Sequence, residues 1–210
     1  MFLIGGNMPP KPKFTKEEIA MTALNIIKEE GINALTARNL ADHLKSSARP
    51  IFTIFKNMEE VKQAARELAL KEFEKYLGNY EDYSPAFKRI GMRMISYAID
   101  YPEQYKLLYM EEYSGNQSFK QYLNELGTFK DICIHLLQKE HTLSQNEANT
   151  LFEQLWIYAY GIGSLCAMKV CEFSEEEIAD RLGLVFAGIL TMIKTKKTYL
   201  KEAAREEKNE

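Results

Sequence analysis

The chain has 210 residues, of which 46% are hydrophobic and 27% are charged, and its formal net charge is −3. This length allows one large domain or two smaller ones, with enough apolar side chains for a substantial core. A net charge so close to zero excludes a uniformly basic protein that coats nucleic acid. Cys133, Cys166 and Cys171 form no CxxC pair, so the sequence indicates neither a disulfide framework nor a zinc site.

No segment has the pattern of a targeting or membrane-spanning sequence. Residues 1–10 contain a short apolar stretch without the basic region or cleavage site of a signal peptide. The uncharged run from Leu155 to Met168 falls short of the roughly 18 residues that suggest a membrane span. We therefore expect a soluble, cytoplasmic protein with a flexible arm at residues 1–13.

Helical patterns follow one another along the chain, and the alternation typical of strands is missing. Four N-terminal caps are predicted where Thr, Asn or Ser is followed three residues later by Glu. They are Thr15 with Glu18, Asn57 with Glu60, Ser144 with Glu147, and Ser174 with Glu177. The N-terminal part is expected to form a helix over residues 17–30, a short helix capped by Thr36, a third helix after a turn at residues 45–47, and a fourth over residues 58–77. The third should bury Ile51, Phe52 and Phe55.

The remaining apolar pattern predicts five helices, over residues 85–101, 102–109, 119–140, 145–170 and 175–201. The predicted fold class is therefore all-α with about nine helices: a three-helix head, a long connecting helix and a helical body. We assign the head to residues 14–60 and the body to residues 61–201. The charged tail at residues 202–210 is expected to fray.

The segment from Leu35 to Met58 has the pattern of a helix-turn-helix, in which the second helix presents its N-terminus to DNA base edges. Thr36 can offer its hydroxyl or backbone N–H to a phosphate, and Arg38 points away from the buried side of its helix. Ser47 is the expected cap of the third helix, with its hydroxyl accepting from the backbone N–H of Arg49, and Pro50 costs little in the first turn. The head from residue 11 to residue 62 carries nine Lys or Arg against seven Asp or Glu, which makes it the more basic part.

The order of these features resembles the TetR-type (tetracycline-repressor-like, TetR/AcrR) family of transcriptional regulators. The resemblance rests on Gly31, on the segment LTARNLA at residues 35–41 and on the segment SARPIFTIFKN at residues 47–57. It implies a DNA-binding head and a helical body that binds a small molecule and dimerises through its last two helices. It places Arg38, Ala48, Arg49, Pro50 and Thr53 at positions that read bases or backbone, and Thr36 and Lys56 at phosphate positions.

Three residues depart from the pattern of that family. Lys45 replaces a turn glycine, Phe52 replaces a tyrosine, and Met58 stands where a lysine is common. We therefore expect affinity to depend more on lysines that remain, among them Lys45, Lys56, Lys11, Lys13 and Lys16. The complete predicted DNA-binding set is Thr36, Arg38, Lys45, Ser47, Ala48, Arg49, Pro50, Thr53 and Lys56.

The body carries two further sets of candidate residues. Aromatic, Met and Cys side chains are candidates for an apolar ligand pocket, although residues of these types more often belong to ordinary core. The candidates are Met94, Tyr97, Tyr101, Tyr105, Tyr109, Met110, Phe119, Cys133, Trp156 and Tyr160. Small residues on the apolar faces of the last two helices permit close approach, which fits a two-fold four-helix interface or an ordinary core. The resemblance favours the interface, with Leu165, Leu182, Val185, Phe186, Ile189 and Ile193 as its candidates.

The sequence thus predicts a dimeric, ligand-responsive regulator, a repressor rather than an activator, that binds a palindromic operator in double-stranded DNA and is released by a small molecule. It offers no catalytic triad, metal cluster or phosphate loop, so no enzyme activity, cofactor or metal is expected. Three alternatives stay open. The segment from Leu35 to Phe55 can be a helical hairpin in an all-α core, the chain can be a helical ligand- or partner-binding protein that has lost DNA binding, or the body can be a small-molecule enzyme.

Overall fold

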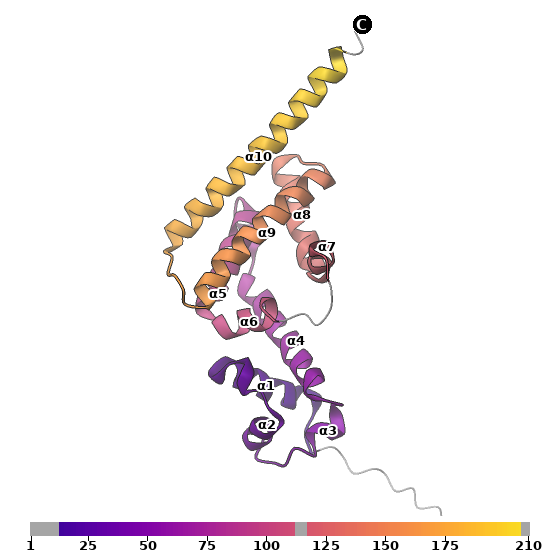
Figure 1. The fold of residues 1–210 in the computed structure, drawn as a ribbon, viewed down its shortest axis with the longest axis vertical. Coiled ribbons are helices and arrows are strands. Elements are labelled where there is room, and N and C mark those ends of the chain that lie inside the picture. The colour runs from indigo at the N-terminus through magenta and orange to yellow at the C-terminus, as the bar shows by residue number, and fades with distance from the viewer. Residues whose placement is uncertain (1–12, 112–116, 207–210) are drawn as a thin grey trace, which may run out of the picture. The chain divides into compact units, whose positions relative to one another are not determined.

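The computed structural model describes residues 13–111 and 117–206, with side chains described up to residue 196. Within those ranges the chain forms ten α-helices, two short 3-10 helices and no strand (Figure 1). The prediction of an all-α fold is confirmed, with one more helix than expected. The chain divides into two compact units, one ending at Phe73 and the other beginning at Glu74. The boundary predicted after residue 60 and the observed division both fall within one long helix, α4 (Met58–Leu77).

The first unit is built from α1 (Lys16–Glu30), α2 (Ala37–His43), α3 (Ile51–Ile54) and most of α4. The predicted cap of α1 is confirmed, because the backbone N–H of Glu18 donates to Thr15 Oγ1 at 3.1 Å and the Glu18 carboxylate accepts from the Thr15 N–H at 2.7 Å. Gly31, with φ of 85°, ends α1 as predicted and leads into the 3-10 helix Ile32–Ala34. The core of the unit consists of fully buried apolar side chains, among them Ile19, Ile26, Leu40, Ile51 and Val61.

Helix α3 differs from its prediction in two ways. It begins at Ile51, and the expected hydrogen bond from the Arg49 N–H to the Ser47 hydroxyl is not formed. Pro50, three positions after Ser47, has no N–H that could take its place. The carbonyl of Ala48 instead accepts from the N–H groups of Ile51 and Phe52. Phe52, which was predicted to be buried, is 44% exposed, since a four-residue helix presents one narrow side to the core and that side is taken by Ile51.

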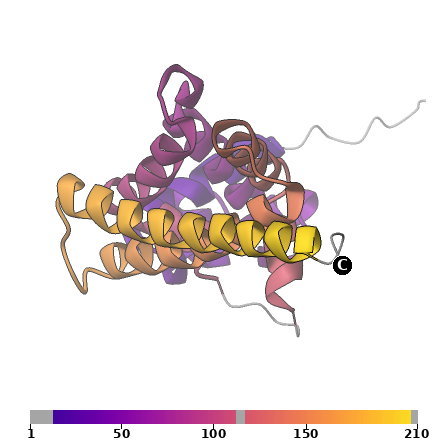
Figure 2. The ribbon, with the colours of Figure 1, turned by 90° about the horizontal axis from the view of Figure 1, so that it is seen from above.

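The second unit contains the 3-10 helix Tyr80–Asp82, α5 (Ala86–Asp100), α6 (Pro102–Tyr109), α7 (Phe119–Glu125), α8 (Thr128–His141), α9 (Gln145–Ala167) and α10 (Glu175–Glu206). Helix α9 is at the centre and packs against α5, α6, α8 and α10. Figures 1 and 2 show α10 lying along α9 and continuing beyond it. None of the described helices is long and apolar enough to cross a membrane.

Three helices in the second unit depart from their predicted bounds, and in two cases the backbone enters the left-handed region. The helix predicted over residues 119–140 is two helices, because Gly127 adopts φ of 51° and ψ of −130°, which a helix cannot contain. Helix α9 ends at Ala167 rather than at residue 170, and Lys169 then adopts φ of 56°. Helix α10 extends to Glu206, past the predicted end at residue 201, while residues 207–210 lie outside the described part.

The predicted caps of the long helices are confirmed. The hydroxyl of Ser144 accepts from the Glu147 N–H, and that of Ser174 accepts from the Glu177 N–H. A cap that the sequence reading missed begins α7, where Ser118 is paired with Gln121. Glutamine replaces the more usual glutamate there and performs the same exchange of hydrogen bonds.

Candidate functional site

The turn between α2 and α3 is held by local hydrogen bonds. Thr36 caps α2, with its Oγ1 accepting from the Asn39 N–H at 3.1 Å, so that predicted cap is confirmed. The Asn39 amide donates to Glu30 and to the carbonyl of Ala34, both at 3.1 Å, and so ties α2 to the end of α1. Lys45 follows α2 with φ of 49°, the left-handed conformation usual for glycine. These contacts fix the direction in which the chain enters α3.

The nine predicted DNA-binding residues lie mostly at the surface of the first unit. Ala48 and Pro50 are half-buried, and the other seven are exposed: Thr36, Arg38, Lys45, Ser47, Arg49, Thr53 and Lys56. Among the described residues no carboxylate pairs with Arg38, Lys45 or Arg49. Lys56 lies 3.6 Å from Glu60 in an exposed contact, which contributes little to stability. The charges of this surface are therefore available to an anionic partner.

One contact of this surface joins residues far apart in sequence. The Lys13 ammonium donates to Ser46 Oγ at 3.0 Å, which brings a further positive charge beside the turn. Lys16 lies over the ring of Phe55, 5.7 Å from its centroid. The sequence indicated both lysines as basic residues but gave no sign of the contact with Ser46. Lys11 lies outside the described residues.

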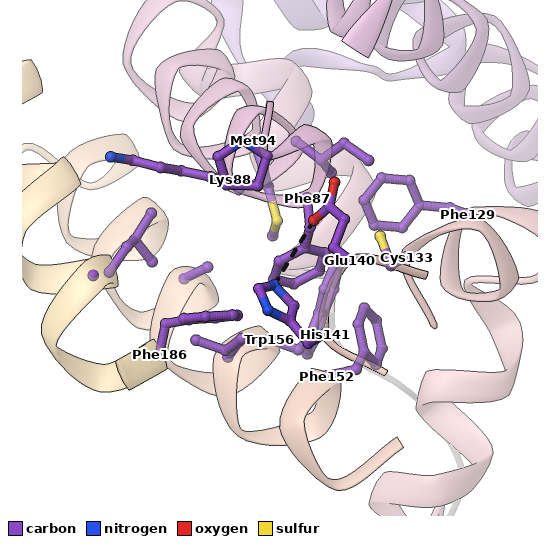
Figure 3. Close-up of a pocket in the computed structure, with 17 residues that line it drawn as sticks. Phe87, Lys88, Met94, Phe129, Cys133, Glu140, His141, Phe152, Trp156 and Phe186 are labelled. Carbon is purple, nitrogen blue, oxygen red and sulfur yellow. Dashed lines mark ion pairs between the residues drawn. The ribbon is translucent and has the colours of Figure 1, made fainter. Parts of the chain in front are cut away.

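The second unit encloses a cavity of about 120 Å³ between α5, α8, α9 and α10 (Figure 3). Its wall is apolar and carries four phenylalanines and one tryptophan: Phe87, Phe129, Phe152, Phe186 and Trp156. The rings of Phe129 and Phe152 lie 6.0 and 5.9 Å from that of Trp156, centroid to centroid. Of the ten predicted pocket residues, Met94, Cys133 and Trp156 line this cavity.

The other seven predicted pocket residues are outside the lining of the cavity: Tyr97, Tyr101, Tyr105, Tyr109, Met110, Phe119 and Tyr160. Several of the tyrosines connect helices instead. The Tyr105 hydroxyl donates to the carbonyl of Tyr160 at 3.4 Å, and the Tyr160 hydroxyl donates to the carbonyl of Tyr109 at 3.1 Å. Burial raises the pKa of Tyr105, whose hydroxyl therefore stays neutral. These hydrogen bonds join α6 to α9.

Glu140 and His141 at the end of α8 were not predicted, and they supply most of the polar groups of the cavity wall. Glu140 Oε1 accepts from the Ala86 N–H at 2.6 Å and so caps α5. Glu140 Oε2 is buried and has no hydrogen-bond partner in the structure; the nearest basic nitrogen, His141 Nε2, is 3.9 Å away. Burial lowers the pKa of His141, a tendency that Lys194 reinforces and Glu140 opposes. Burial raises the pKa of the Cys133 thiol, which remains protonated.

The predicted dimer-interface residues divide between two locations. Leu182 and Phe186 line the cavity, whereas Leu165 is 38% exposed on α9, and Val185, Ile189 and Ile193 are half-buried on α10. The most exposed apolar side chains of these helices were not among the predicted ones. Leu184 and Met192 are 77% and 73% exposed on α10, and Ile157 and Met168 are 50% and 55% exposed at α9 and its end.

Within the described ranges, no three His, Cys, Asp or Glu side chains gather closely enough to hold a metal ion. His135 is exposed on α8.

Comparison with known proteins relates the chain to one fold. No family model matches it, and no curated protein matches it in sequence. Nine chains of solved structures match, among them a TetR-like transcriptional regulator from Rhodococcus sp. RHA1, with a TM-score of 0.60 and 15% sequence identity. The match covers 83% of this chain and 95% of that one. The resemblance seen in the sequence is therefore confirmed at the level of the fold, which is that of a TetR-like regulator.

Proposed function

Starting from the TetR-like fold, we propose that the chain is a DNA-binding transcriptional regulator controlled by a small molecule. One observation carries the proposal. Arg38, Lys45 and Arg49 are exposed and form no ion pair among the described residues, and they belong to a helix-turn-helix whose first helix is fixed by hydrogen bonds of Thr36 and Asn39. Arginine donates to guanine O6 and N7 in the major groove, and lysine contacts phosphates. The description of the Rhodococcus protein as a transcriptional regulator supports this assignment.

The regulator acts as a homodimer in this proposal. Helices α9 and α10 pack together and carry exposed apolar side chains at Ile157, Leu165, Leu184 and Met192, which a second copy can cover. A two-fold dimer presents two recognition helices to half-sites about one DNA turn apart, so the operator is palindromic. Thr36, Ser47, Ala48, Pro50, Thr53 and Lys56 complete the surface that meets the bases and phosphates.

Release from DNA follows from ligand binding in the body. The cavity between α5, α8, α9 and α10 is the proposed effector site. A ligand that binds the DNA-free conformation more tightly lowers operator affinity, and coupling of this kind typically amounts to about 1–3 kcal/mol. The proposed role is that of a repressor, which the ligand removes from its operator.

Selection of bound duplexes from a random DNA library at low salt tests the proposal, and we expect a palindromic sequence to be enriched. With that operator, Arg49→Ala should weaken binding by about 1–3 kcal/mol and relax base preference at one position of each half-site. Lys56→Ala should weaken binding to all sequences and reduce the salt slope by about 1. The matched control is Lys71→Ala, an exposed lysine of α4 outside the proposed surface, which should leave affinity unchanged.

If no palindrome is enriched, the proposal is wrong and the alternative function, a helical ligand- or partner-binding protein without DNA binding, takes its place. The exposed phenyl ring of Phe52 favours that alternative, because it has no group that donates a hydrogen bond to a phosphate. If a palindrome is enriched but Arg49→Ala and Lys56→Ala bind it normally, the DNA-binding function stands and the residue assignment fails.

A further inference from the structure

We propose that the cavity of the second unit binds a lipophilic amine in its protonated form, with the apolar part against the aromatic wall and the ammonium group paired with Glu140. The inference rests on the proposed function only in taking this cavity as the effector site. It goes further by assigning the chemical class of the effector.

The first observation is that one carboxylate oxygen of Glu140 accepts no hydrogen bond. Its Oε1 is held by the Ala86 N–H at 2.6 Å, which keeps the carboxylate at the wall of the cavity. Its Oε2 is buried without a hydrogen-bond partner, a costly state for a carboxylate oxygen. A ligand that brings an N–H donor with a positive charge satisfies this oxygen and neutralises the buried charge.

The neighbouring basic side chains do not fulfil that role. His141 Nε2 is 3.9 Å from Glu140 Oε2, too far for a hydrogen bond, and burial lowers the pKa of the imidazole and so favours its neutral form. Figure 3 shows Lys88 directed away from Glu140 and His141, so its ammonium does not neutralise the carboxylate. Lys194, on α10, also lowers the pKa of His141 and so further favours the neutral imidazole.

The second observation is the aromatic wall. The faces and edges of Phe87, Phe129, Phe152, Trp156 and Phe186 surround the space next to Glu140 (Figure 3). Such rings bind apolar groups through burial and attract cations through their negative faces. An anionic ligand is repelled by the carboxylate and by the negative faces of the rings. A neutral ligand gains the burial and at most a hydrogen bond to Glu140, but it does not neutralise the buried charge.

Access to Glu140 requires a small side-chain movement. Oε2 is covered by its neighbours in the structure, and the His141 ring, which lies 4.9 Å from the ring of Phe186, is next to it. The proposal therefore requires a rotation of the His141 side chain that opens Glu140 Oε2 to the cavity. The ring is half-buried at the end of α8, where rotation displaces no backbone.

Three probes that share one apolar body test the proposal: 3-phenylpropylammonium, 3-phenylpropanol and 3-phenylpropanoate. Trp156 is the single tryptophan of the chain and lines the cavity, so its fluorescence reports binding directly, without DNA. We expect the ammonium probe to bind about tenfold or more tighter than the alcohol, and the carboxylate to bind weakest. Equal binding of the ammonium and alcohol probes, or tightest binding of the carboxylate, overturns the proposal.

Glu140→Gln supplies the variant, because the Gln amide oxygen can still accept from the Ala86 N–H while the charge is lost. We expect it to remove the preference for the ammonium probe and to leave binding of the alcohol unchanged. Asp131→Asn is the control: it removes one charge from an exposed position of the same helix, outside the cavity, and should keep the preference. A preference that persists in Glu140→Gln contradicts the role of Glu140.

If the Gln variant is unstable, the affinities of the three probes for the unaltered protein still show whether the cavity prefers a positive charge. Because these measurements contain no DNA, their failure leaves the DNA-binding proposal standing. Conversely, an amine-selective cavity in a protein that enriches no operator sequence would confirm the ligand class and reject the regulator function.

Discussion

Lys45 combines an unfavourable backbone conformation with a useful charge. Its φ of 49° places it in the left-handed region, which costs a side-chain-bearing residue about 1 kcal/mol relative to glycine. The sequence already indicated this strain, since glycine is usual at that point of the turn. Its exposed ammonium lies in the proposed DNA surface, so we infer that DNA contact is the reason for retaining a lysine there.

Replacing Lys45 by glycine should therefore separate stability from binding. Lys45→Gly is expected to raise the free energy of unfolding by up to about 1 kcal/mol, measured by urea denaturation, while weakening operator binding and reducing its salt slope by about 1. The matched control is Lys169→Gly, which relieves the same strain after α9, where φ is 56°. It should stabilise without altering DNA binding, and loss of operator affinity in Lys169→Gly would contradict the assignment of Lys45.

At the scale of elements, one glycine of α9 determines how closely α6 packs against it. A Cβ atom at Gly163 would lie 2.5 Å from the hydroxyl oxygen of Tyr105, which is fully buried. Gly161, two residues earlier, faces open space. The two glycines look alike in the sequence, where both are small residues in an apolar helix. Only Gly163 lies against a side chain of another helix within the unit.

These two glycines give a paired test of the packing. Gly163→Ala should destabilise the protein by about 1–3 kcal/mol, because Tyr105 must move from its place against α9. Gly161→Ala should be neutral or stabilise by up to about 1 kcal/mol, since alanine favours the helix and meets no neighbour. Thermal and urea unfolding of both variants measures the difference. Equal effects of the two substitutions would show that the contact between Tyr105 and Gly163 does not determine helix packing.

For the molecule as a whole, the outer faces of α9 and α10 are the least covered apolar part of the second unit. Leu184 and Met192 are more than 70% exposed, and both are on α10. An exposed apolar patch of this kind marks an interaction surface in soluble proteins. A second copy of the chain is the partner that we propose for these side chains.

A charge placed on this surface should prevent dimerisation. We expect the unaltered protein to be a dimer in light scattering after gel filtration, and Leu184→Glu to shift it toward the monomer and lower its operator affinity. Ile99→Glu adds the same charge at an exposed apolar position of α5, where Ile99 is 45% exposed, and should remain dimeric. Monomeric behaviour of the unaltered protein at micromolar concentration, or an unchanged dimer in Leu184→Glu, would reject this interface.

The sequence by itself determined where the helices with predicted Thr15, Thr36, Ser144 and Ser174 caps begin, and the all-α fold to which they belong. A cap such as Thr15 with Glu18 is a contact between residues three positions apart, so it can be read without knowledge of the fold. The pattern from Leu35 to Met58 is equally local and was sufficient to predict a TetR-like fold, which the structural match confirms. Roles in DNA binding, ligand binding and dimerisation remain proposals.

Only the tertiary structure decided which side chains form the cavity and which join the helices. Glu140 is 54 positions from Ala86, whose N–H it accepts, and no periodic pattern marks that pairing. Phe52 and Ile51 are adjacent and both apolar, yet only Ile51 is buried, because a helix as short as α3 has one narrow contact face. Apolar periodicity shows that a residue can be buried, but the partner that buries it comes from distant segments, whose arrangement is fixed only when the whole chain packs.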